Sequence, residues 1–104
     1  MKRVKRRYLA LQVDSEGAPS QRELMDAVWG SVAKLYGEVG ASLTGLVLVD
    51  FDVERRLAVV RVSLAAVGLV RASLASIVSV GGRDAAVHVV AVSGTLKALF
   101  GMLG

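Results

Sequence analysis

The sequence has no cysteine, no asparagine, one histidine and one proline. Without cysteine the chain has no disulfide and no thiolate metal site, and nothing in it is typical of a secreted protein. A Cys–His nucleophile is impossible, and a zinc site would lack its usual ligands. Ser93 would need His88 as its base, but five strand positions place them about 16 Å apart. His88 is therefore expected to be a structural residue, and the chain is not expected to be an enzyme by itself.

Long apolar runs are also missing, although hydrophobic residues make up 54% of the 104 residues. The longest, 64–80, is interrupted by Gly68, Arg71 and three serines, and it falls short of the ~20 residues that cross a bilayer. No signal-peptide core follows the basic N-terminus. These features predict one domain over residues 1–104, located in the cytoplasm and not in a membrane.

Positive charge is concentrated at the start of the chain. The net charge is +4, but the first seven residues carry five cations, so the other 97 residues have eight Lys/Arg against nine Asp/Glu. Such an arm suits nucleic-acid phosphates, because each neutralised phosphate releases counterions. The alternative is a solubilising tail on an apolar domain. The five residues are Lys2, Arg3, Lys5, Arg6 and Arg7.

Hydrophobic periodicity predicts alternating strands and helices. Strands are expected at 7–13, 43–51, 57–62 and 85–92, and helices at 21–36, at 64–79 and after residue 92. Ser20 and Glu23 form a capping box for the first helix, and Gly37 and Gly40 can end it. Ser63 can cap the second helix.

The apolar stripe of the first helix should include Trp29 and Leu35 as buried residues. The order of elements predicts an α+β, ferredoxin-like (split βαβ) fold: an antiparallel sheet in the order 4-1-3-2 with helices on one face, plus a C-terminal helix.

Ser93-Gly94-Thr95 joins the last strand to the last helix. A small, hydroxyl-rich helix start can hold an anion through free backbone N–H groups and the helix dipole, and Lys97 could add a charge. Gly94 should allow a tight turn and close approach. An ordinary N-cap is the alternative. Acylphosphatases have a related fold, but their phosphate loop and asparagine are missing here.

Aromatic residues are only 5% of the chain, and Tyr8 is the one that the central strands offer. Base stacking is therefore excluded as the main way of binding RNA, which leaves phosphates and shape. The predicted RNA-binding residues are Lys2, Arg3, Lys5, Arg6, Arg7, Tyr8, Arg61, Arg83, Ser93, Gly94, Thr95 and Lys97.

Two other surfaces require interpretation. Asp50, Asp52 and Glu54 have a spacing that could hold a divalent ion, but a solvated hairpin end is the commoner explanation, so no metal site is predicted. The second helix carries one charge, Arg71, which suggests that another chain covers part of it. The predicted protein-interface residues are Ala65, Val67, Ala72 and Ser76.

Several motifs resemble the archaeal ribonuclease P protein component 2 family, in the right order along nearly the whole chain. The most specific is Val92-Ser93-Gly94-Thr95-Leu96-Lys97. The others are Arg6-Arg7-Tyr8-Leu9, Ala27-Val28-Trp29, Gly37-Glu38-Val39-Gly40 and Val70-Arg71-Ala72-Ser73-Leu74.

The resemblance implies a non-catalytic subunit of ribonuclease P, which removes the 5′ leader from precursor tRNA. Its catalytic RNA subunit would hold the magnesium, and the protein itself would bind no cofactor. The implied partners are ribonuclease P RNA, precursor tRNA, the TIM-barrel-like protein component 3 and a second copy of this chain. Relatives often continue with more basic residues after the last helix, whereas Lys97 is the only charge after Asp84 here. The competing reading is a small ferredoxin-like regulatory module that binds proteins and no RNA.

Overall fold

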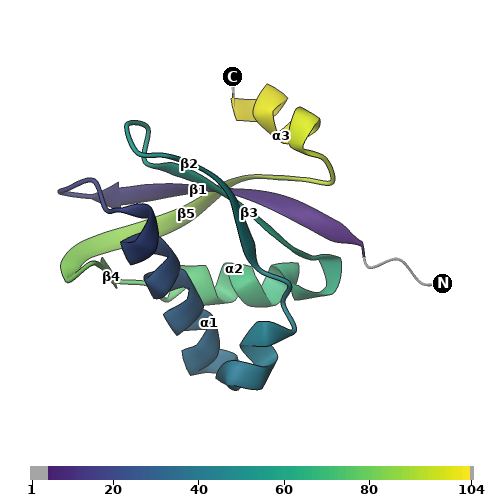
Figure 1. Ribbon diagram of the computed structural model, residues 1–104, viewed down its shortest axis with the longest axis horizontal. Coiled ribbons are helices and arrows are strands. Elements are labelled where there is room, and N and C mark those ends of the chain that lie inside the picture. Colours follow the sequence, from purple (N-terminus) through teal and green to yellow (C-terminus); the bar gives the residue numbers. More distant parts are fainter. Residues whose placement is uncertain (1–4, 104) are drawn as a thin grey trace.

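A computed structural model describes residues 5–103 of the chain (Figure 1). Its sheet has the order β2-β3-β1-β5-β4, and every neighbouring pair is antiparallel. The four long strands keep the predicted ferredoxin-like order, and β4 is an addition at one edge. The elements are β1 (Arg6–Ser15), α1 (Gln21–Ser42), β2 (Val47–Asp52), β3 (Leu57–Ser63), the 3₁₀ turn η1 (Leu64–Ala66), α2 (Val67–Ala75), β4 (Ser79–Val80), β5 (Arg83–Ser93) and α3 (Leu96–Leu103).

The sheet is covered on both faces, by α1 and α2 on one side and by α3 on the other (Figure 1). Successive strand residues point to opposite faces, so β1 contributes to two cores. Leu9 and Leu11 join the main core under α1 and α2. Ala10 lies in a second, smaller cluster with Leu99 of α3, so α3 is attached to the body through a small contact.

Helix α1 begins with the predicted capping box. Ser20 Oγ accepts a hydrogen bond from the Glu23 N–H at 3.1 Å, and Glu23 Oε1 accepts one from the Ser20 N–H at 3.0 Å. These bonds satisfy two of the donors that a helix start leaves free. Gly37 has φ 77° and breaks the helix where expected, but helical structure resumes and continues to Ser42.

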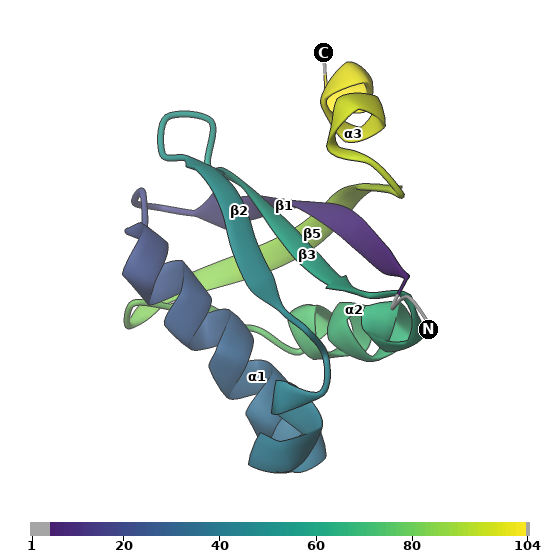
Figure 2. The same cartoon turned by 45° about the vertical axis from the view of Figure 1, so that its right-hand side comes forward.

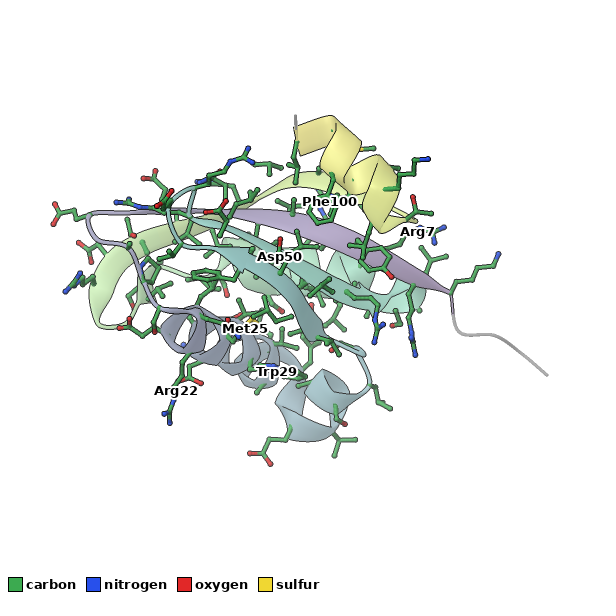
Figure 3. All side chains as sticks on the ribbon, turned by 45° about the horizontal axis from the view of Figure 1, so that its top comes forward. Arg7, Arg22, Met25, Trp29, Asp50 and Phe100 are labelled. Atoms are coloured by element: carbon green, nitrogen blue, oxygen red, sulfur yellow. The ribbon has the colours of Figure 1, made fainter. Side chains whose placement is uncertain are left out.

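Two predictions of burial on α1 were wrong. Trp29 is 37% exposed and Leu35 is 50% exposed, whereas Leu24, Val28 and Val32 are buried. The stripe that meets the sheet is therefore one residue per turn wide, and the larger side chains lie at its margins. Figure 3 shows Trp29 and Met25 on the same helix, and Arg22 pointing away from the sheet.

The second helix is shorter than predicted. A 3₁₀ turn occupies 64–66, the α-helix covers only Val67–Ala75, and Ser63 makes no side-chain cap. Ser76 Oγ donates back to the Ser73 carbonyl at 2.6 Å as the helix ends. The chain then buries Ile77 and forms β4. The spacing of Ile77 fits a longer helix, but its burial in the core accompanies an earlier end of α2.

The remaining boundaries follow from turn chemistry. Leu43 ends α1, so the predicted strand from 43 begins only at Val47. Gly81 and Gly82 have φ 62° and 78°, the left-handed conformations that a two-residue hairpin turn requires, and they join β4 to β5. Asp52 Oδ1 accepts the N–H groups of Glu54 and Arg55, each at 3.1 Å, and so fixes the β2–β3 hairpin turn.

Candidate nucleic-acid interface

One end of the sheet gathers most of the predicted RNA-binding residues. Tyr8 in the centre is paired with Arg61 on β3 and with Ser93 on β5. Arg6 is paired with Ser63 and lies two residues before Tyr8, so it shares that face. This face is the one that α3 partly covers. From the sequence, Ser63 was considered only as a helix cap, because only the strand register reveals its position beside Arg6.

The start of β1 is fixed to the body. The Lys5 carbonyl accepts a hydrogen bond from the Leu64 N–H at 2.8 Å, and Figure 2 shows the start of β1 beside α2. Arg7 Nη1 donates to the Arg6 carbonyl at 2.9 Å. Lys5 and Arg6 are exposed and Arg7 is half-buried. We call Lys5, Arg6, Arg7, Arg61 and Lys97 the cationic end; Lys2 and Arg3 lie outside the described residues.

The turn before α3 forms the expected cap. Thr95 Oγ1 accepts the Ala98 N–H at 3.2 Å, and Ser93 Oγ accepts the Thr95 N–H at 3.3 Å. Lys97 is exposed in the first turn. Both hydroxyls therefore serve the backbone of the turn, as an ordinary N-cap does.

Gly94 is not required by the geometry of this turn. Its φ is not among the positive values of the described glycines, and a Cβ would lie 3.6 Å from Arg7 Nη1, an ordinary contact. The turn itself therefore does not need the conformational freedom of Gly94, and the predicted close approach of a ligand there stays a prediction. Figure 3 shows Arg7 next to the start of α3. The turn and the start of β1 accordingly form one continuous surface.

Arg83 does not belong to this surface. It begins β5, whereas Ser93 ends it, and ten strand steps separate them by about 33 Å. Its guanidinium lies over Gly17 and lowers the pKa of Glu23, after the larger effect of the Ser20 hydrogen bonds. A pocket of about 520 Å³ at that opposite end is lined by Asp14, Glu16 and Asp84 together with apolar residues. That end thus carries acids together with arginines, whereas the charged residues named at the cationic end are all basic.

Two other candidate groups lie away from the cationic end. His88 is exposed on β5 and is paired with Gln12. The acids of the β2–β3 hairpin include Asp52, whose carboxylate fixes the turn. Within residues 5–103, no group of three or more acidic, histidine or cysteine residues is placed to hold a metal ion. No helix in this part of the chain is long and apolar enough to cross a membrane.

Comparison with known proteins identifies relatives over nearly the whole chain. The model of the Rpp14/Pop5 family matches residues 7–103. Ribonuclease P protein component 2 of Methanosarcina mazei is 35% identical over 95 residues, which are 91% of this chain and 80% of that protein. The Pyrococcus furiosus protein of the same name is 32% identical over 97 residues, 93% and 81% of the two chains. This chain belongs to the Rpp14/Pop5 family.

A solved structure supports the fold. A chain in the cryo-EM structure of yeast ribonuclease MRP aligns with a TM-score of 0.70, at 20% identity, over 92% of this chain and 79% of that chain. The two chains thus share a fold at low sequence identity, as expected when the order and register of the strands determine the architecture.

The predicted protein-interface residues of this Rpp14/Pop5 chain are placed unequally. Ala65, Ala72 and Ser76 are exposed on η1 and α2, whereas Val67 is half-buried and packs against the main core. Small side chains leave the outward surface of α2 smooth, and Arg71 is its one charge. A smooth, weakly charged helix face suits contact with another protein more than contact with RNA phosphates.

Proposed function

We propose that this chain is a non-catalytic protein subunit of ribonuclease P that supports the catalytic RNA in removing the 5′ leader from precursor tRNA. The family match over residues 7–103 carries this proposal, because the similar archaeal proteins are ribonuclease P protein components. The fold and the register explain how such a subunit would present its charge.

The RNA-facing surface would be the cationic end. It brings five basic side chains to one end of the sheet, from Lys5 just before β1 and from β1, β3 and α3. Such a surface positions a protein on RNA through phosphates, without reading bases. Lys2 and Arg3 would extend the same charge along the chain.

The protein partners would use the helical layer. The exposed Ala65, Ala72 and Ser76 provide a surface on the face of the molecule away from α3. We assign this face to the TIM-barrel-like component 3 or to a second copy of the chain. RNA and protein would then bind on different sides of the subunit.

Magnesium would reside on the RNA subunit. The protein would lower the magnesium concentration needed for cleavage, because its cations replace part of the counterion screening that folded RNA otherwise takes from the metal. Precursor tRNA cleavage, reconstituted with ribonuclease P RNA and component 3 across a magnesium series, tests this. We expect a lower requirement with the protein and no cleavage by the protein without RNA.

The control replaces Lys5, Arg6 and Arg7 with alanine. This variant should fold but bind RNA more weakly, with a salt dependence reduced by about one unit of slope per lost contact. An unchanged magnesium requirement with the wild-type protein would contradict the proposal. RNA affinity that is absent in the wild type would favour a protein-interaction module instead.

A further inference from the structure

Arg61 contains an unsatisfied polar atom inside the molecule. Within residues 5–103, its Nε is the one buried side-chain nitrogen or oxygen that has no hydrogen-bond partner. The terminal nitrogens Nη1 and Nη2 make no hydrogen bond to a described residue either, and they are not among the buried atoms. The guanidinium therefore has Nε inside the protein, while its terminal nitrogens are not fully covered.

The other half-buried arginines do not share this state. Arg7 Nη1 donates to the Arg6 carbonyl at 2.9 Å, and Arg56 Nη1 donates to the Ser15 carbonyl. Arg61 has no such acceptor, and no salt bridge joins it to a carboxylate in the described part of the chain. Partial burial of a charge without a counter-charge or an acceptor is unfavourable. Within residues 5–103, Arg61 is thus a partly buried cation that no hydrogen bond or ion pair of its guanidinium compensates.

The neighbouring strands limit the space around the Arg61 side chain. Tyr8 on β1 and Val47 on β2 are its cross-strand neighbours, so its stem runs between two side chains on the same face. Tyr8 is half-buried against the cluster below α3. A guanidinium flanked in this way can offer two parallel N–H groups, which match two oxygens of a phosphate.

We propose that Arg61 binds one RNA phosphodiester through Nη1 and Nη2 as a preformed, bidentate clamp. This inference rests on the proposed function and adds to it a distinction among the cations. Lys5 and Arg6 are exposed and act as point charges, so lysine and arginine are interchangeable there. Arg61 supplies a fixed fork, and lysine cannot replace it. The RNA phosphate in turn provides the counter-charge that the fold leaves out.

The clamp predicts opposite changes in stability and in RNA affinity. Arg61→Met removes the uncompensated charge and keeps an unbranched stem, so the melting temperature of the free protein should rise or stay level. Its affinity for ribonuclease P RNA should fall about tenfold or more, the range for a hydrogen-bonded charged pair. Arg61→Lys should lose most of that affinity, a clearly larger loss than Arg6→Lys causes, because the exposed Arg6 contributes mainly its charge, which lysine keeps.

Arg56→Met is the matched control. Arg56 is also half-buried and flanks β3 at its other end, but its guanidinium already has a carbonyl acceptor. This variant should be less stable and should bind RNA as the wild type does. Melting curves and filter binding to ribonuclease P RNA at several salt concentrations give both readouts for all four variants.

The outcomes separate the clamp from the function. Wild-type protein that fails to bind the RNA refutes the proposed function. Wild-type binding that Arg61→Met and Arg61→Lys both retain refutes the clamp alone. Full RNA affinity in Arg61→Lys would show that a point charge is sufficient at this position, and it would also refute the clamp. If Arg61→Met destabilises the fold as strongly as Arg56→Met does, Arg61 has a structural role and the clamp is refuted. If Arg61→Met impairs only assembly with component 3, the anion that Arg61 binds is a protein carboxylate and not an RNA phosphate.

Discussion

Replacing Leu99 with alanine should detach α3 without unfolding the rest of the protein. Leu99 is 0% exposed and is the one fully buried residue of α3 in the described structure. Its cluster contains Ala10, Leu57 and Val59, and it is distinct from the main core under α1 and α2. The change therefore removes the principal attachment of α3 and leaves the main core intact.

The magnitude follows from what else holds α3. A buried Leu→Ala change costs about 2–5 kcal/mol. The remaining attachment consists of the partly buried Leu96 and Leu103 and a 3.3 Å hydrogen bond from Arg55 Nη2 to the Leu103 carbonyl, which contributes about 1 kcal/mol. An eight-residue helix is not stable alone. The α3 amides should therefore lose at least about thirtyfold in hydrogen-exchange protection.

Native-state hydrogen exchange measures this, with Leu74→Ala as the comparison. Leu74 is buried in the main core, so its truncation should reduce protection in β1 and β3 as well as in α3. The Leu99 variant should keep the protection of β1 and retain the RNA affinity that the start of β1 supplies. Equal loss of protection in β1 and α3 after Leu99→Ala would show that α3 belongs to one cooperative unit and refute this reasoning.

Four further substitutions test other parts of the structure. Ser20→Ala should lower the free energy of unfolding in urea by about 1 kcal/mol through loss of the capping box. The Ser20 hydrogen bonds lower the pKa of Glu23 in the folded protein. The ionised carboxylate therefore stabilises the fold above its unfolded pKa of about 4.3, and this stabilisation is lost as the pH falls through the folded pKa. Glu23→Gln should abolish that pH dependence of the melting temperature. Ala72→Glu should weaken co-purification with component 3 or self-association but not melting, whereas Val67→Glu should impair folding.

The strand order could be predicted from the sequence because it depends on long, simple patterns. Alternation in β1 and the βαββαβ order leave one arrangement once crossovers are right-handed. The ends of the second helix could not be predicted in the same way. Ile77 fits the helical stripe and also fits a buried turn, and only packing against the sheet decides between them.

Burial on α1 failed for a related reason. Trp29 lies within the apolar stripe, but a helix that crosses a twisted sheet buries a narrow line of residues such as Leu24, Val28 and Val32. Large side chains beside that line remain partly exposed. Periodicity locates the buried side of a helix, whereas the width of the buried stripe depends on the shape of the sheet.

The strand register brings some of the predicted RNA-binding residues together and places others far apart. Arg61 joined Tyr8 and Ser93, because antiparallel pairing places them in one row. Arg83 was grouped with them from its charge alone, but it begins the same strand that Ser93 ends. Charge in a sequence identifies candidates, and the strand direction determines which of them can contact the same stretch of RNA.

The arrangement of the cations has a consequence for how this subunit can vary. Lys5 and Arg6 are exposed, so their replacement should change RNA affinity with little effect on the fold. The hydrophobic cores contain no cation, so changes there should act on stability first. Arg61 affects both stability and RNA affinity, because its partial burial destabilises the free protein while its guanidinium binds the phosphate. A substitution that improves stability at this position should therefore weaken RNA binding, and a selection for thermal stability without RNA should replace Arg61 before it replaces Arg6.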